Sequence, residues 1–126
     1  MKIYPVSISS RDPDTGEIEI IMGLRFQDIK ELAWHPTVEK LLKKGKEYTV
    51  THIPTGLVIA FFSNEYKAKK FTIAIKKYDW DCTKKDFENY TKNEKQRLLD
   101  WINKIKGIIG HGKKKISSHT RQMFQV

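Results

Sequence analysis

The strongest structural signal in the sequence is an alternating segment rich in β-branched residues, followed by a turn and a second apolar segment. Residues 46–53 alternate between two faces of an extended strand, which carry Tyr48, Val50 and His52 on one side and Thr49, Thr51 and Ile53 on the other. Pro54, Thr55 and Gly56 are turn formers, and residues 57–62 form a continuous apolar run of β-type composition. This pattern predicts a β-hairpin over residues 46–62.

A second hairpin is predicted near the N-terminus. Tyr4, Val6 and Ile8 alternate with Pro5 and Ser7, and residues 11–16 are dense in turn formers. Residues 17–22 alternate again, with Ile18, Ile20 and Met22 on one face and Ile21 on the other. Two hairpins most simply make a four-stranded antiparallel sheet.

The spacing of apolar residues changes between residues 25 and 44. Phe26, Ile29, Leu32 and Ala33 recur at helical intervals, Pro36 interrupts the pattern, and Val38, Leu41 and Leu42 resume it. We therefore expect two short helices that meet near His35 and Pro36 and pack into the core. A DNA-reading helix-turn-helix is disfavoured because the connection is too short.

Residues 63–78 fit two interpretations. With period two, Phe71, Ile73 and Ile75 form a strand; with period 3.6, one helical face carries Ala68, Phe71, Thr72, Ile75 and Tyr78. We favour the helix, with Ser63 or Asn64 as its N-cap.

The last helix has a clearer apolar stripe, formed by Phe87, Tyr90, Leu98, Trp101, Ile102, Ile105 and Ile109. Thr91 and Glu94 have the spacing of a capping box, so the main helix is predicted to start there, and Gly107 to end or kink it. The predicted fold is therefore α+β: two β-hairpins in a four-stranded antiparallel sheet, with helices packed on one face. Residues 1–110 form the single domain, and residues 111–126 form a basic C-terminal tail.

Composition limits the class of protein. Hydrophobic residues make up 39% and charged residues 31% of 126, which fits a globular domain and neither a membrane protein nor a disordered chain. The single cysteine, Cys82, excludes an internal disulfide framework. The first residues lack the apolar stretch of a signal peptide, so we expect a cytoplasmic protein with no membrane association.

Charge is distributed unevenly along the chain. Residues 1–42 contain 5 basic and 7 acidic residues, a net charge of −2, whereas residues 43–126 contain 19 basic and 8 acidic residues, a net charge of +11. Such an asymmetry is typical of a protein that binds a polyanion or an acidic surface, although a basic surface can also serve solubility alone.

The sequence offers little catalytic chemistry. No Gly-x-Ser-x-Gly motif or phosphate-binding glycine loop is present, and His111 and His119 lack the spacing of a metal site. Asp79 and Asp81 precede Cys82 closely and disfavour its thiolate. We therefore expect a protein that is not an enzyme and needs no cofactor.

One pair of acidic residues supports a weaker alternative, in which the protein is a metal-dependent enzyme. Asp79 and Asp81 could share a divalent ion with His52 or Glu88, as in a metal-dependent nuclease. Acidic residues are also common in turns before helices, which is the simpler interpretation. Trp80 between them is predicted to anchor the core.

The favoured hypothesis is non-catalytic binding of nucleic acid through the phosphate backbone, with weak sequence specificity because 20 lysines stand against 4 arginines. If one sheet face is open, Tyr48 and His52 could contact bases there; Tyr48 could equally pack in the core with Val50. The alternative is a small phage- or mobile-element-type adaptor or inhibitor that binds an acidic protein surface. The candidate binding residues are Lys69, Lys70, Lys76, Lys77, Lys113, Lys114, Lys115, Arg121, Tyr48 and Tyr66.

Overall fold

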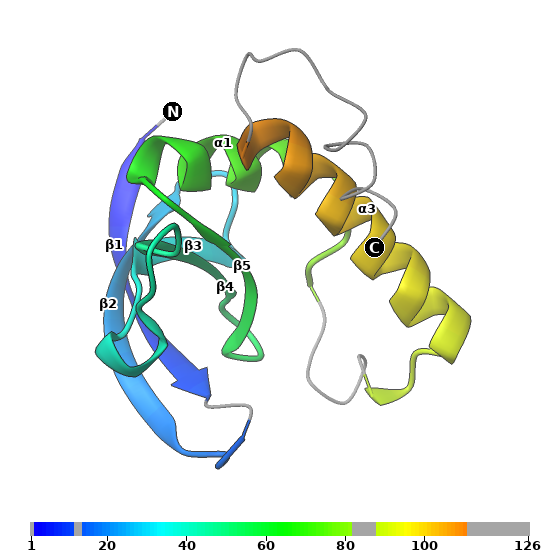
Figure 1. The fold of residues 1–126 in the computed structure, drawn as a ribbon, viewed down its shortest axis with the longest axis horizontal. Helices are drawn as coiled ribbons and strands as arrows, with labels where there is room; N and C mark the ends of the chain where they lie inside the picture. The colour runs from blue at the N-terminus through cyan, green and yellow to red at the C-terminus, as the bar shows by residue number, and fades with distance from the viewer. Residues whose placement is uncertain (1, 12–13, 82–87, 111–126) are drawn as a thin grey trace.

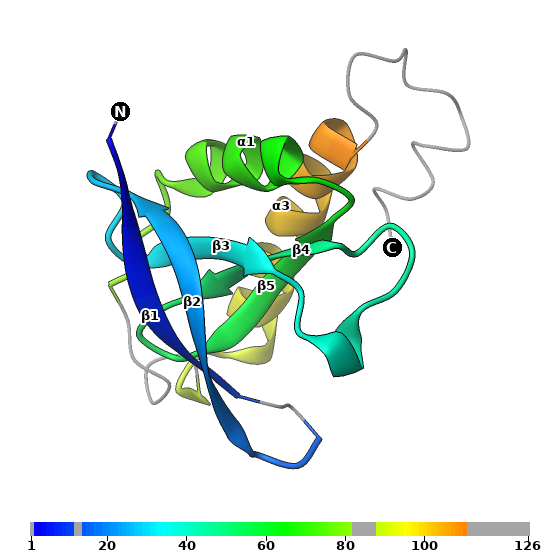
Figure 2. The ribbon, with the colours of Figure 1, turned by 90° about the vertical axis from the view of Figure 1, so that its left-hand side faces the viewer.

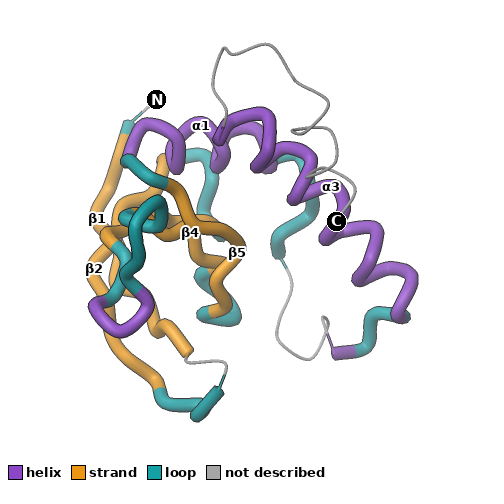
Figure 3. Tube along the Cα trace, viewed as in Figure 1, coloured by secondary structure: helices purple, strands orange, loops and turns teal. Residues whose placement is uncertain are grey.

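The computed structural model describes residues 2–11, 14–81 and 88–110, and it shows five antiparallel strands and two helices (Figures 1 and 3). The strands lie in chain order in one sheet, so each pairs with its sequence neighbours. The elements are β1 (Ile3–Arg11), β2 (Ile18–Phe26), β3 (Leu32–Pro36), a short 3-10 helix (Glu39–Leu41), β4 (Tyr48–His52), β5 (Leu57–Phe62), α1 (Glu65–Ile75) and α3 (Lys92–Gly110). The α+β class is confirmed, but the sheet has five strands rather than the four predicted.

Both predicted hairpins are present. β1 and β2 pair along their whole length, from Ile3 opposite Phe26 to Arg11 opposite Ile18. β4 and β5 pair through the turn that Gly56 closes with a φ of 71°, a left-handed conformation that favours glycine. These elements are predictable because the alternation and the turn chemistry are both local.

The two helices predicted between residues 25 and 44 were wrong. β2 continues to Phe26, Leu32–Pro36 forms β3, and only Glu39–Leu41 is helical, as a single 3-10 turn. The misleading pattern has a physical cause, since Leu32, Ala33, Trp34 and His35 are all buried. A strand covered on both faces shows no alternation of polar and apolar residues.

The sheet curls so that the β1–β2 hairpin covers one face of the remaining strands (Figure 2). β2 pairs with β3 only at Leu24 opposite Trp34, and β1 reaches β5. Ile8 is fully buried, and a Cβ on Gly23 would lie 2.7 Å from the Cδ1 of Ile8 and 3.0 Å from the Trp34 carbonyl oxygen. Gly23 thus allows the hairpin to cross closely over β3.

The other face of β3, β4 and β5 carries the main hydrophobic core. Trp34, Val50 and Phe62 pack there against α1, and α3 packs alongside α1 (Figure 1). The full core cluster comprises Phe26, Ile29, Leu32, Trp34, Val50, Ala60, Phe62, Ala68, Phe71, Ile75, Trp80 and Ile102. Trp80 donates from Nε1 to the Ile75 carbonyl at 2.7 Å, so it anchors the connection that follows α1.

Residues 65–75 are helical, which confirms the favoured interpretation of that segment. Asn64 is the N-cap, and its side-chain oxygen accepts from the backbone N–H of Lys67 at 2.9 Å. The buried face carries four of the predicted residues, Ala68, Phe71, Thr72 and Ile75.

The capping box of α3 is also confirmed. The Thr91 N–H donates to Glu94 Oε1 at 3.0 Å, and the Glu94 N–H donates to Thr91 Oγ1 at 3.1 Å. Gly107 does not end the helix, because α3 continues to Gly110, and the alternative that Gly107 kinks the helix stays a prediction. Packing of Ile105 and Ile109 against the core cluster stabilises this last turn despite the glycine.

Several predictions concern residues outside the described part of the chain. These are Cys82, Phe87, His111, His119 and the proposed tail over residues 111–126. Within the described ranges, no helix has the length and apolar character needed to cross a membrane.

The close crossing at Gly23 is testable by a double-mutant cycle. We expect Gly23→Ala to lower the free energy of unfolding by about 1–3 kcal/mol, because the added methyl overpacks a site bounded by Ile8 and the β3 backbone. Ile8→Val removes the Cδ1 atom, so the penalty of Gly23→Ala should shrink in that background. Urea unfolding of the wild type, both single variants and the double variant measures this coupling, and strictly additive losses would contradict the assigned contact.

Candidate nucleic-acid interface

The outer side of α1 presents cations and one aromatic ring. Because Ala68, Phe71, Thr72 and Ile75 face the core, the opposite ridge carries Tyr66, Lys70, Ile73 and Lys77 at helical spacing. All four side chains are exposed, and Lys70 Nζ lies 5.3 Å from the centroid of the Tyr66 ring. Of the predicted binding residues, the structure brings Tyr66, Lys70 and Lys77 together on this ridge.

Two further cations adjoin the ridge, and a third lies over β5. Lys67 lies at its N-terminal end, where Nζ donates to the Ser63 hydroxyl at 3.2 Å, and Lys76 is the exposed C-cap residue. Lys46 lies over the Phe61 ring, with 5.0 Å between Nζ and the ring centroid. We call lysines 67, 70, 76 and 77 of α1 and its C-terminal end, together with Lys46 and Lys106, the basic surface.

Lys106 on α3 is a half-buried member of the basic surface. Burial lowers the pKa of Lys106, and the positive charge of nearby Lys46 lowers it further. Two neighbouring cations repel one another, and this repulsion is relieved when an anion binds between them. A phosphate that binds between Lys46 and Lys106 would therefore be stabilised by both charges.

Lys69 points elsewhere. Its Nζ lies 5.9 Å from the centroid of the buried Trp34 ring, whose Nε1 donates to Glu65 Oε2 at 3.0 Å. Lys69 thus covers an edge of the core next to a carboxylate, away from the outer ridge of α1.

Within the described residues, no open sheet face presents Tyr48 and His52 together, and the alternative placement of Tyr48 is confirmed, because it packs against the core cluster that contains Val50. His52 is 1% exposed, and both of its ring nitrogens are engaged by Thr55 and by the Trp80 carbonyl. Tyr48 is half-buried beside a cavity of about 290 Å³, which the carboxylate of Glu65 borders and which no lysine of the described ranges lines. The curling of the sheet and the docking of α1 leave neither face of β4 open.

The hairpin side of the molecule has the opposite character. Ile18, Ile20 and Met22 form an exposed apolar stripe on β2. Glu17 and Glu19 lie exposed in the same part of the hairpin. The β1–β2 turn lies at the other end of the molecule from α1 in both views (Figures 1 and 2), so the start of β2 lies away from the lysines of α1.

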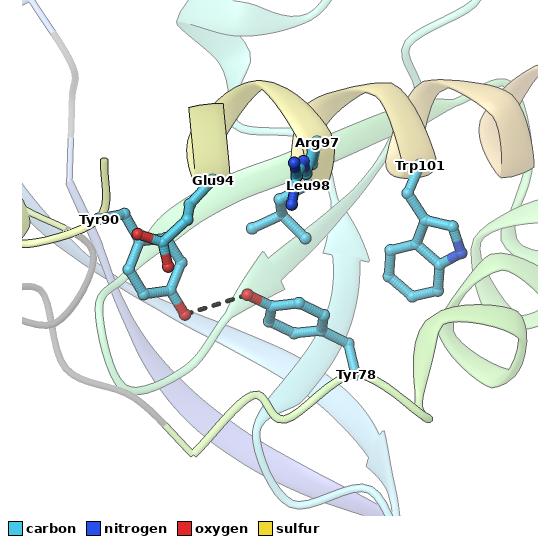
Figure 4. A pocket seen from close by; sticks show the side chains of 6 residues that line it. All are labelled: Tyr78, Tyr90, Glu94, Arg97, Leu98 and Trp101. Carbon is cyan, nitrogen blue, oxygen red and sulfur yellow. Dashed lines mark hydrogen bonds between the residues drawn. The ribbon is translucent and has the colours of Figure 1, made fainter. Parts of the chain in front are cut away.

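An aromatic pocket that the sequence did not reveal lies between α3 and the segment after α1 (Figure 4). Its volume is about 300 Å³, and its lining residues are Tyr78, Tyr90, Glu94, Arg97, Leu98 and Trp101. The Tyr78 and Tyr90 hydroxyls form a hydrogen bond of 3.0 Å, and the Tyr78 ring centroid lies 5.9 Å from that of Trp101. One sequence pattern could have indicated this wall of the pocket. It is the i, i+3, i+4, i+7 spacing of one helix face, which is followed by Glu94, Arg97, Leu98 and Trp101.

Glu94 has a fixed position at the border of this pocket. Hydrogen bonds from Thr91 hold the pKa of Glu94 below its ordinary value, and the charge of Arg97 contributes in the same direction. The carboxylate is therefore ionised at neutral pH and is oriented by the helix cap.

The acidic pair after α1 has a structural role. The Asp79 Oδ1 atom accepts from the Asp81 N–H at 3.1 Å, which is a local turn interaction. Among the described residues, no three potential metal ligands come together. The metal-dependent nuclease therefore gains no support from this part of the chain. Lys113, Lys114, Lys115 and Arg121 lie outside it.

Comparison with known proteins found no similarity: no family model, curated protein or solved structure matches the chain.

Two buried histidines lie in the sheet, His35 on β3 and His52 on β4. His35 donates from Nδ1 to the Pro36 carbonyl and accepts at Nε2 from the Thr51 hydroxyl, at 2.8 and 2.9 Å. His52 donates from Nε2 to the Trp80 carbonyl and accepts at Nδ1 from Thr55, at 2.6 and 2.8 Å. Burial lowers the pKa of both histidines, although these carbonyl contacts oppose the effect, as does Glu31 near His52.

These histidines give the fold a defined pH dependence. Below about pH 6.5 the histidines of the unfolded chain bind protons, whereas the folded histidines stay neutral because their pKa is lower. The free energy of unfolding is therefore highest above that pH and falls as the pH decreases through it. We expect the free energy of unfolding to drop between about pH 7.5 and 5.5, by at most about 1.4 kcal/mol per pH unit for each histidine. Urea titrations across this range measure the slope; His35→Gln should roughly halve it, and a flat profile for the wild type would contradict the assignment.

Proposed function

We propose that this protein is a non-catalytic nucleic-acid-binding protein that contacts the phosphate backbone through the basic surface. One observation carries the proposal: Lys70 and Lys77 lie exposed on one ridge of α1 and its C-terminal end, with Lys76 beside them, while the hairpin end presents apolar and acidic side chains. A purely solubilising charge needs no such separation, whereas a polyanion is best bound by cations on one side.

The chemistry of the cations favours backbone contacts over base reading. Lysine offers a point charge to phosphate, whereas specific base contacts in a duplex most often use the bidentate guanidinium of arginine. Arg25 lies 5.9 Å from the Tyr4 ring centroid and donates to the Phe26 and Gln27 carbonyls, so Arg97 at the aromatic pocket is the exposed arginine set against the many lysines of the described residues. We therefore propose weak sequence specificity.

The proposal extends to the rest of the chain and to its surroundings. In it, residues 1–110 are the domain and residues 111–126 are a basic tail, where Lys113, Lys114, Lys115 and Arg121 add phosphate contacts. We place the protein in the cytoplasm. An acidic protein surface is the alternative partner for the same lysines, and the binding experiment below distinguishes the two.

Salt dependence tests the proposal directly. We expect an oligonucleotide of about 20 nucleotides to bind with a log–log salt slope of about −5 as a duplex and about −4 as a single strand, for about six phosphate contacts. Replacing Lys70 and Lys77 together by Gln should reduce the duplex slope by about 2 and weaken affinity at low salt. Fluorescence anisotropy with DNA and RNA oligonucleotides measures both quantities.

Glu19→Gln is the control for net charge, because it adds one positive unit to the total at the hairpin end of the molecule. It should leave the slope and the affinity unchanged, since that side chain lies on the hairpin, away from α1. Absence of binding to every oligonucleotide at low salt would overturn the proposal and favour the acidic protein partner. If Glu19→Gln raised affinity by as much as the lysine substitutions lowered it, binding would depend on the net charge of the protein. The position of the basic surface would then have no role.

A further inference from the structure

We propose that the aromatic pocket bounded by Tyr78, Tyr90 and Trp101 binds one unstacked base of a single-stranded nucleic acid. The inference rests on the proposed function and adds the type of nucleic acid that the protein prefers. Its basis is the pocket itself, which combines aromatic walls, hydrogen-bonding groups and a cation at one border (Figure 4).

The walls have the chemistry of a stacking site. Tyr78, Tyr90 and Trp101 are half-buried, so part of each ring remains accessible; Tyr78 and Trp101 pack against the core cluster, and the Tyr90 hydroxyl is bonded to that of Tyr78. The Tyr78 ring is supported from behind by Trp80, with 4.7 Å between the ring centroids. Every base has a π-face, and a rigid aromatic surface therefore accepts bases with little regard to sequence.

The polar groups at the border suit a base and its phosphates. The guanidinium of Arg97 is exposed at the pocket, and Lys76 and Lys77 directly precede Tyr78 in the chain. A strand whose phosphates lie along the α1 ridge therefore meets Lys77 immediately before Tyr78, which is part of the pocket wall. The tyrosine hydroxyls and the Glu94 carboxylate offer hydrogen-bonding partners for the edge of a base.

An organic cation is the competing occupant, because aromatic cages also bind quaternary ammonium groups. Glu94 would favour such a ligand, but its carboxylate already accepts from the Thr91 N–H, and the guanidinium of Arg97 lies exposed at the same pocket. Arg97 thus supplies a cation for the phosphate of a bound nucleotide beside the aromatic walls. A base in a duplex is stacked and paired, so insertion requires a single strand.

The three tryptophans provide a local probe. Trp34 is 0% and Trp80 3% exposed, whereas Trp101 is half-buried and lines the pocket. Stacking of a base should therefore quench the fluorescence of Trp101 selectively. The experiment titrates the full-length protein with a single-stranded thymidine oligonucleotide of about 12 nucleotides and with an abasic strand of the same length and charge.

We expect the thymidine strand to quench tryptophan fluorescence and to bind about ten-fold more tightly than the abasic strand, which corresponds to the loss of one stacked base. Tyr90→Leu and Arg97→Gln should each weaken the thymidine strand, and Tyr90→Leu should leave abasic binding unchanged. Tyr4→Leu and Arg25→Gln make the same chemical changes on the hairpin and should leave both strands unaffected. Melting temperatures identify any variant that has lost its fold. Tyr78→Phe then replaces that variant, because it changes the pocket least, and it should cause a smaller loss of affinity for the thymidine strand while abasic binding stays unchanged.

The outcomes separate this inference from the proposed function. Equal affinity for the two strands, with no quenching, overturns the base pocket and leaves backbone binding intact. Failure of both strands to bind overturns the proposed function and the pocket together. Displacement of the thymidine strand by tetramethylammonium chloride, beyond the effect of sodium chloride at equal ionic strength, assigns the pocket to an organic cation and overturns the inference.

Discussion

The structure depends on the pair of strands β3 and β4, which is buried on both faces. One face packs Trp34 and Val50 against α1, and the other places His35 and Thr51 beneath the β1–β2 hairpin. Polar groups buried there must find partners inside the protein, because an unsatisfied donor or acceptor costs about 1–3 kcal/mol. The His–Thr hydrogen bonds meet this requirement, so the sheet can curl over a partly polar interior. The double burial also explains why Gly23, at the crossing of β2 and β3, has no side chain.

This arrangement determines which surfaces remain open to a partner. With both faces of β3–β4 covered, the exposed functional groups are those on the outside of α1 and along α3, and those on the hairpin. The basic two-thirds of the sequence supplies the first surface, and the mildly acidic third supplies the second. The aromatic pocket lies between α3 and the segment that follows α1.

Local signals predicted much of this fold. The β4–β5 hairpin, the Asn64 cap and the Thr91–Glu94 capping box follow from residues a few positions apart. β3 was missed because burial on both faces removes its alternation. The placement of Tyr48 and His52 toward bases required an open sheet face, whereas this sheet curls and β4 is covered on both faces, so the alternative with Tyr48 against the core is the arrangement found. The pocket was missed because Tyr78 and Trp101 lie far apart in sequence and meet only through the packing of α3 beside α1.

The central claim is that nucleic acid contacts the helical side of the molecule and leaves the hairpin free. Amide chemical-shift mapping of the isotopically labelled protein, titrated with a single-stranded oligonucleotide, tests this claim most directly. The expected result is a continuous set of perturbed amides along α1, around Lys46 and Lys106, and at Tyr78 and Arg97, with β1 and β2 unchanged. Perturbations centred on Ile18, Ile20 and Met22, or scattered over all faces, would contradict the account.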